Sequence, residues 1–309
     1  MSGGHDHGAG SGAGTADHRR RLAVVLAITT SVLVVEVAGA VVSGSLAMLA
    51  DAGHMLTDAA GLTIALIAAN LALRPATAER TWGYRRAEVL GATLQAAVLL
   101  AVGVYVFVEG IRRLFEPPEV GSTAMIVFGI IGLLGNLVSM WVLMRGRGSN
   151  VNMRAAFLEV VNDALGSVAV LLAALIIALT GWLRADAVVS MLIALLIIPR
   201  TLRLLRETVS VLLESTPPGL DLDDVRTHLL GQPHVLEVHD LHASQITSEL
   251  PVLTAHVVVD ESCFHDGHAP QILDQLPSCL AEHFPVSVEH STFQLEPRMH
   301  ASHEHAAHD

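Results

Sequence analysis

Six apolar segments dominate this sequence, and each is long enough to cross a bilayer as a helix. A bilayer-spanning helix needs about 20 mostly apolar residues. Hydrophobic residues make up 52% of the 309-residue chain. Because lipid cannot satisfy open backbone groups, a helical membrane domain is the expected fold. The six segments are Leu22–Val42, Leu46–Leu73, Ala87–Ile111, Thr123–Met144, Ala155–Thr180 and Ala185–Leu205.

Arginines are distributed unevenly between the two ends of these segments. They cluster before the first segment, between the second and third, between the fourth and fifth, and around the end of the sixth. The opposite side has only Arg112, Arg113 and Arg184. Since basic residues are retained on the cytoplasmic side, both termini are predicted to be cytoplasmic. The net charge of −12 argues against a nucleic-acid partner, which requires a basic surface.

A different pattern begins near Pro217 and predicts a small C-terminal α+β domain. A helix, two strands, a helix and a third strand follow one another, in the order αββαβ. Their expected bounds are Leu220–Leu230, Val235–His242, Val252–Asp260, Pro270–His283 and Val286–Leu295. The chain is therefore expected to have four parts: a His/Gly-rich flexible tail (1–18), a six-helix membrane domain (19–212), a cytoplasmic αββαβ domain (213–297) and a His-rich flexible tail (298–309).

Two of the expected spans carry ligand-type side chains four residues apart. The second span has His54 and Asp58, and the fifth has Glu159 and Asp163. Residues at this spacing share one face of a helix. One imidazole and three carboxylates can surround Zn²⁺ or a harder divalent ion. The alternative is that they only join helices through hydrogen bonds. Ionisable groups inside a bilayer cost several kcal/mol each, which favours the functional interpretation.

Three stretches of the sequence resemble the cation diffusion facilitator family. They are Ser43–Asp58, Thr81–Glu88 and Asn152–Ser167, and the similarity extends from Arg19 to Pro297. The resemblance implies a homodimer that exports divalent metal ions from the cytoplasm in exchange for protons. It also implies a metallochaperone-like cytoplasmic domain. Zinc-transporting members usually have His where this chain has Glu159, so Mn²⁺, Fe²⁺, Co²⁺ and Cd²⁺ are alternative substrates.

The cytoplasmic domain offers a second set of candidate metal ligands. His239 and His256 occupy positions that bind zinc in some members of the family. Where those members supply another His and an Asp near the end of the domain, this chain has Gln294 and Glu296, so the pattern is incomplete. His265 and His268 lie in a predicted loop and either complete that site or are simply exposed. The competing interpretation places all these histidines on a solvated sheet face. A metal bound here would be structural or regulatory.

These patterns together predict a Zn²⁺ efflux transporter in the plasma membrane of a bacterium. Alternating access would expose the ion first to the cytoplasm and then to the outside. The alternative from another class is a membrane-anchored metal sensor. An enzyme is not expected, because no nucleophile–base arrangement or phosphate loop is present, and no organic cofactor is expected. Two further expectations concern single residues: Arg86 pairs with Glu214 or both stay solvated, and Asp186 caps its own helix.

Overall fold

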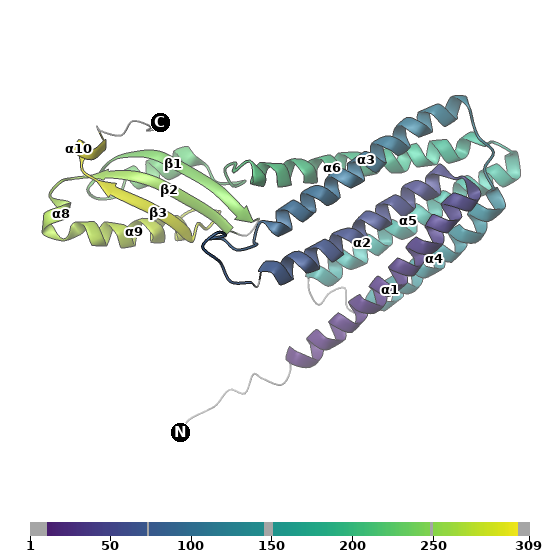
Figure 1. Ribbon diagram of the computed structural model, residues 1–309, viewed down its shortest axis with the longest axis horizontal. Helices are drawn as coiled ribbons and strands as arrows, with labels where there is room; N and C mark the ends of the chain where they lie inside the picture. Colours follow the sequence, from purple (N-terminus) through teal and green to yellow (C-terminus); the bar gives the residue numbers. More distant parts are fainter. Residues whose placement is uncertain (1–10, 73, 145–150, 248–249, 302–309) are drawn as a thin grey trace, which may run out of the picture. The chain divides into compact units, whose positions relative to one another are not determined.

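The computed structural model describes the chain except residues 1–10, 73, 145–150, 248–249 and 302–309 (Figure 1). Six long helices fall on the six predicted apolar segments. They are α1 (Ser11–Ser43), α2 (Leu46–Ala72), α3 (Ala87–Phe115), α4 (Ser122–Met144), α5 (Val151–Thr180) and α6 (Arg184–Leu212). The predicted N-terminal tail is corrected, because α1 already begins at Ser11.

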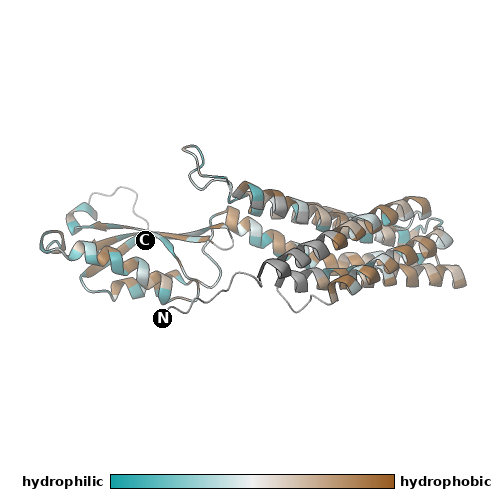
Figure 2. Ribbon diagram, turned by 90° about the horizontal axis from the view of Figure 1, so that it is seen from below, coloured by the Kyte–Doolittle hydropathy of each residue, from teal (hydrophilic) through white to brown (hydrophobic). Residues whose placement is uncertain are grey.

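Five of these helices are long and apolar enough to cross a membrane, among the residues that the structure describes. They are Val24–Ser43 within α1, α3, α4, Phe157–Thr180 within α5, and α6. The 27-residue α2 has the length of a spanning helix, and its role as a sixth span stays a prediction. Large apolar side chains point outward, with Val41 79% and Leu196 78% exposed. The long helices are predominantly brown in Figure 2, because most of their residues are apolar, as lipid surroundings require.

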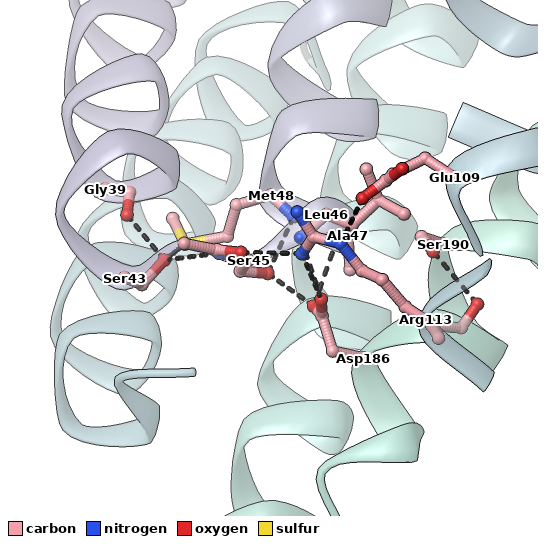
Figure 3. Close-up of polar contacts among 12 residues, drawn as sticks. Gly39, Ser43, Ser45, Leu46, Ala47, Met48, Glu109, Arg113, Asp186 and Ser190 are labelled. Carbon is pink, nitrogen blue, oxygen red and sulfur yellow. Dashed lines mark hydrogen bonds and ion pairs between the residues drawn. The ribbon is translucent and has the colours of Figure 1, made fainter. Parts of the chain in front are cut away.

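A side chain from α6 caps the N-terminus of α2 (Figure 3). The carboxylate of Asp186 accepts hydrogen bonds from the Ser45 hydroxyl at 2.5 Å and from the backbone N–H groups of Leu46 at 2.8 Å and Ala47 at 3.1 Å. A helix N-terminus has free N–H groups and a partial positive charge, and a carboxylate satisfies both. The expectation that Asp186 caps its own helix is therefore wrong: it fixes the start of α2 instead.

A guanidinium group from α3 completes this junction. Arg113 donates to the carbonyl of Gly44 at 2.8 Å and lies 3.7 Å from the Asp186 carboxylate. It also pairs with Glu109 one turn earlier on α3, at 3.1 Å. Asp186 is only 1% exposed, so its charge needs these partners. The cap therefore joins three helices, α2, α3 and α6, at one end of the helical part.

The chain divides into two compact units, Met1–Thr63 with Leu94–Leu204, and Ile64–Thr93 with Leu205–Asp309. The second unit contains a three-stranded sheet of order β1-β2-β3. In it β1 and β2 are antiparallel, whereas β2 and β3 are parallel and are connected through a helix, α9. Its elements are α7 (Leu222–Leu230), β1 (Val235–Thr247), β2 (Leu250–Val259), α8 (Cys263–Asp266), α9 (His268–Glu282), β3 (His290–Glu296) and α10 (Arg298–Ala301).

The α/β part has the predicted αββαβ order, which confirms the predicted fold class. The N-cap Asp221 starts α7, accepting from the N–H of Asp223 at 2.9 Å. The helix α9 places Ile272, Leu276 and Leu280 in the core that covers one face of the sheet. Several bounds differ from expectation: β1 continues to Thr247 rather than ending at His242, β3 begins at His290 rather than at Val286, and the start of the predicted C-terminal tail is helical over Arg298–Ala301.

The predicted pair between Arg86 and Glu214 is present. The Nη2 atom of Arg86 lies 2.8 Å from Oε1 of Glu214, within the second unit. Both side chains are exposed, and pairs of this kind contribute about 0–1 kcal/mol. A ring contact between Trp82 and His290 of β3, with centroids 4.8 Å apart, joins the segment between α2 and α3 to the sheet of the same unit. Together the two contacts fix the segment between α2 and α3 against the α/β part.

The Asp186 cap gives the first prediction. Asp186→Ala leaves the Ser45 hydroxyl and two backbone N–H groups without their acceptor, which should lower the free energy of unfolding by about 1–3 kcal/mol. Thermal unfolding of the detergent-purified protein measures this loss. Ser190→Ala is the control, because the buried Ser190 hydroxyl donates only to Ala187 of its own helix. Equal losses in the two variants would show that the cap does not stabilise α2.

Candidate metal sites

Three of the four ligands predicted in the spans come together between α2 and α5. One ligand atom from each of His54, Asp58 and Asp163 lies within 4.8 Å of the others. The i,i+4 spacing on α2 places Nε2 of His54 3.3 Å from Oδ2 of Asp58. Asp163 contributes from the facing helix and is 3% exposed. Two helices therefore supply one imidazole and two carboxylates to a single point in the apolar part.

These side chains retain unused hydrogen-bonding capacity. Within the described part of the chain, His54 Nδ1, Asp58 Oδ2 and Asp163 Oδ1 are buried and have no hydrogen-bond partner. A buried polar atom without a partner costs about 1–3 kcal/mol, and more if it is charged. A divalent cation held by the carboxylates and the imidazole would offset that cost. The donor set therefore fits a metal ion as a bound substrate.

The fourth predicted ligand, Glu159, lies one turn before Asp163 on α5. It is exposed and is not part of the three-residue group, although it interacts electrostatically with Asp58 and His54. Arg200 of α6 interacts electrostatically with all three of these residues. Arg200 is one of the arginines around the end of the sixth apolar segment, which the sequence assigns to the cytoplasmic side. Its position just after Pro199, inside a predicted span, is the sequence signal that could have identified it as a residue near the metal site.

A second polar group adjoins the first within the helices. The amide of Asn136 donates to Ser167 at 3.2 Å, and the Ser167 hydroxyl donates to Glu36 at 3.3 Å. Asp51 interacts with Glu36 and Ser167 through side-chain hydrogen bonds. Glu36 and Asp51 are 2% and 4% exposed. This polar group joins α1, α2, α4 and α5, and the Asp51 charge also acts on Asp163.

Two glycines make room for these carboxylates. A Cβ atom on Gly166 of α5 would overlap Oδ1 of Asp51. A Cβ on Gly132 of α4 would lie 2.7 Å from Oε1 of Glu36. Small residues allow such close approach between helices in a membrane. The glycines therefore explain how two buried carboxylates fit between closely packed helices.

In the α/β part, His239, His256 and Glu296 come together across the three strands. Nε2 of His239 lies 2.6 Å from Oε1 of Glu296, and Nδ1 of His256 lies 3.7 Å from its Oε2. The strand register explains this, because His239 faces His256, and Val258, two residues further along β2, faces Glu296. The two imidazoles and the 1% exposed carboxylate form a second group that could hold a metal ion.

Asp240 is a neighbour of this group that sequence reasoning missed. Its Oδ2 atom lies 3.5 Å from His239 and 3.9 Å from His256. The residue has a positive φ of 47° and sits where the β1–β2 register is interrupted between His239 and His242. A bulge redirects a side chain that strict alternation would send to the other face. Alternation alone therefore gave no signal for Asp240.

The other two predicted ligands, His265 and His268, lie elsewhere. His265 belongs to the short helix α8, and His268 begins α9. Nδ1 of His268 lies 2.8 Å from Asp266, and its ring packs on that of His234 with centroids 4.7 Å apart. Neither residue joins His239, His256 and Glu296 in the metal group. The expectation that they could complete that site is therefore corrected.

Each of the two parts of the chain matches a known protein-family model. Residues 22–213 match the model of the cation efflux transmembrane domain, and residues 217–298 match that of the cytoplasmic domain of cation efflux proteins. The chain is thus a multi-pass membrane protein with a cytoplasmic C-terminal domain.

Similar curated proteins cover almost the full length of the chain. The metal cation efflux system protein CzcD of Cupriavidus metallidurans is 41% identical, over 94% of this chain and 89% of its own. The zinc transporter ZitB of Escherichia coli is 40% identical, over 91% and 88%. The cadmium, cobalt and zinc/H(+)-K(+) antiporter of Bacillus subtilis is 36% identical, over 96% and 93%. The chain belongs to the cation efflux family, also called cation diffusion facilitators, which are transporters and not enzymes.

Proposed function

We propose that this protein exports divalent metal ions from the cytoplasm in exchange for protons, with Zn²⁺ as its main substrate. The observation that carries the proposal is the convergence of His54, Asp58 and Asp163, each of which has one buried nitrogen or oxygen atom without a hydrogen-bond partner. Metal binding requires deprotonated ligands, so entry of the ion releases protons and protonation from outside expels it. Membership in a family that includes an antiporter supports the coupling to protons.

Glu159 is proposed as the fourth ligand of the transported ion. It forms an i,i+4 pair with Asp163 on α5, and it interacts electrostatically with His54 and Asp58. The resulting site has one nitrogen and three oxygen ligands, which is harder than a site with two imidazoles. Relatives named for cadmium, cobalt and zinc support a preference for this group of ions. Co²⁺, Cd²⁺, Mn²⁺ and Fe²⁺ are therefore the competing substrates.

The assembly proposed for this function is a homodimer in the plasma membrane of a bacterium, with both termini cytoplasmic. The proposed domain bounds are 19–212 for the membrane domain and 213–297 for the cytoplasmic domain. Six spans give an even number of crossings, so both termini lie on the side that carries most of the arginines. The group of His239, His256 and Glu296 would then bind Zn²⁺ from the cytoplasm as a structural or regulatory ligand.

A membrane-anchored metal sensor is the second candidate, and the metal group in the α/β part is the observation that favours it. In that case metal binds but does not cross the membrane. Proteoliposomes with an imposed pH gradient distinguish the two functions. Zn²⁺ movement that depends on the gradient supports transport. Zn²⁺ binding without any flux would identify a sensor and overturn the proposal.

The first functional prediction concerns Asp163. Asp163→Asn removes a charged ligand while keeping the side-chain shape, so Zn²⁺ flux in proteoliposomes should fall to background. Glu109→Gln is the matched control: it removes another partly buried carboxylate, one that pairs with Arg113 outside the proposed site, and it should retain most of the flux. Size-exclusion chromatography verifies the folding of both variants. Normal flux in Asp163→Asn would refute the site.

The second prediction concerns metal preference. Glu159→His exchanges an oxygen ligand for a nitrogen ligand and should shift the preference from Mn²⁺ towards Zn²⁺ roughly tenfold, or about 1.4 kcal/mol. Competition between the two ions in the flux assay measures the shift. Glu159→Gln separates loss of charge from gain of an imidazole. An unchanged preference in Glu159→His would exclude Glu159 as a ligand.

The third prediction concerns Arg200, whose positive charge acts on three of the proposed ligands. Arg200→Gln removes this repulsion of a bound cation and should strengthen Zn²⁺ binding about fivefold, which corresponds to about 1 kcal/mol. Arg203→Gln is the control, since Arg203 lies on the same helix and is also exposed. Calorimetric titration of the detergent-purified variants measures both affinities. Equal Zn²⁺ affinities in the two variants would show that the charge of Arg200 does not weaken metal binding at this site.

A further inference from the structure

A third group of ligand-type side chains lies where two helices of the α/β part end, outside the sites described above. His228 is in the last turn of α7, Cys279 is in the last turn of α9, and His283 follows α9 directly. One ligand atom from each residue lies within 4.8 Å of the others. The rings of His228 and His283 are 5.0 Å apart between centroids.

Helix geometry brings two of the three side chains to the same face. Cys279 and His283 are four residues apart, and the N–H of His283 donates to the carbonyl of Cys279 at 3.1 Å. The helical turn therefore continues to His283, and the two side chains are neighbours. Cys279 is 4% exposed, whereas His283 is exposed. The group thus extends from the edge of the core to the surface, which gives an ion a path from solvent.

The surroundings of this group favour a bound cation. Nε2 of His228 is buried and has no hydrogen-bond partner among the described residues. The side-chain amide of Gln232 donates a hydrogen bond to Sγ of Cys279 at 3.7 Å. A thiolate is a stronger acceptor of such a hydrogen bond than a thiol is. Both α7 and α9 end here, and the free carbonyls at a helix C-terminus carry a partial negative charge.

We propose that His228, Cys279 and His283 form a further metal site, for a divalent ion of the Zn²⁺ and Cd²⁺ class. Two imidazoles and a thiolate provide three ligands of a tetrahedron, and water fills the fourth position beside the exposed His283. Bonds of about 2.3 Å to sulfur and about 2.0 Å to nitrogen give tetrahedral edges of about 3.5 Å. Because the ligand atoms lie within 4.8 Å of one another, each gap must close by at most about 1.3 Å, which side-chain rotation can provide.

The chemistry of this site differs from that of the other two groups. The groups of His54 and of His239 combine imidazole with carboxylate oxygens, whereas this group has a thiolate, which favours softer ions such as Cd²⁺. Burial raises the pKa of the Cys279 thiol, so the metal-free thiol retains its proton near neutral pH. Metal binding must displace that proton. The proposal does not depend on transport, because the site between α2 and α5 contains no cysteine.

The two cysteines of the chain provide the test and its control. Co²⁺ bound to a thiolate has a charge-transfer absorption band in the near ultraviolet, which imidazole and carboxylate ligands do not produce. The full-length protein in detergent is titrated with Co²⁺ alone. The band should appear in the wild type and in Cys263→Ser, whose cysteine is equally buried but belongs to no metal group. It should be absent in Cys279→Ser.

His283→Ala keeps the test decisive if Cys279→Ser does not fold. Because His283 is exposed, its removal leaves the core intact and should weaken Co²⁺ binding at this site at least about tenfold. No thiolate band in the wild type, a band that persists in Cys279→Ser, or unchanged binding in His283→Ala would each overturn the proposal. Zn²⁺ flux measured on the same preparations reports separately on the proposed transport function.

Discussion

Carboxyl groups buried between apolar helices are the constraint on which the helical part depends. Glu36, Asp51 and Asp163 are each less than 5% exposed, and a buried charge is costly unless it has partners. The structure meets this constraint in two ways. Glu36 and Asp51 share hydrogen bonds with Ser167, in space left by glycines on α4 and α5. Glu36 and Asp163 each keep a buried oxygen without a hydrogen-bond partner, but only Asp163 lies with an imidazole and a second carboxylate, those of His54 and Asp58. Only this second arrangement is suited to an ion that must bind and leave.

The position of α2 follows from interactions at its N-terminus. Asp186 and Arg113 fix the first turn of α2 to α6 and α3 (Figure 3), seven residues before the first ligand of the site. An i,i+4 pair is useful only if its helix cannot rotate about its axis. Buried hydrogen bonds at the cap therefore serve the metal site indirectly, by holding His54 and Asp58 towards α5.

Sequence patterns predicted most of the architecture and part of two metal groups, those of His54 and of His239. Apolar length located the helices, and i,i+4 spacing placed His54 beside Asp58. Contacts between distant segments were harder to predict. Asp186 caps another helix and Asp240 is redirected by a bulge, and neither property is local in sequence. The His228 group was missed because its residues lie on different helices, about 50 positions apart, and were considered separately.

The central claim is that a divalent ion binds between α2 and α5. Anomalous diffraction from crystals of the full-length protein grown with Cd²⁺ tests it most directly. The claim predicts an anomalous peak about 2.0–2.5 Å from ligand atoms of His54, Asp58 and Asp163. That peak should disappear in Asp163→Asn while peaks in the cytoplasmic domain remain. Cadmium bound only in the cytoplasmic domain of the wild type would contradict the claim.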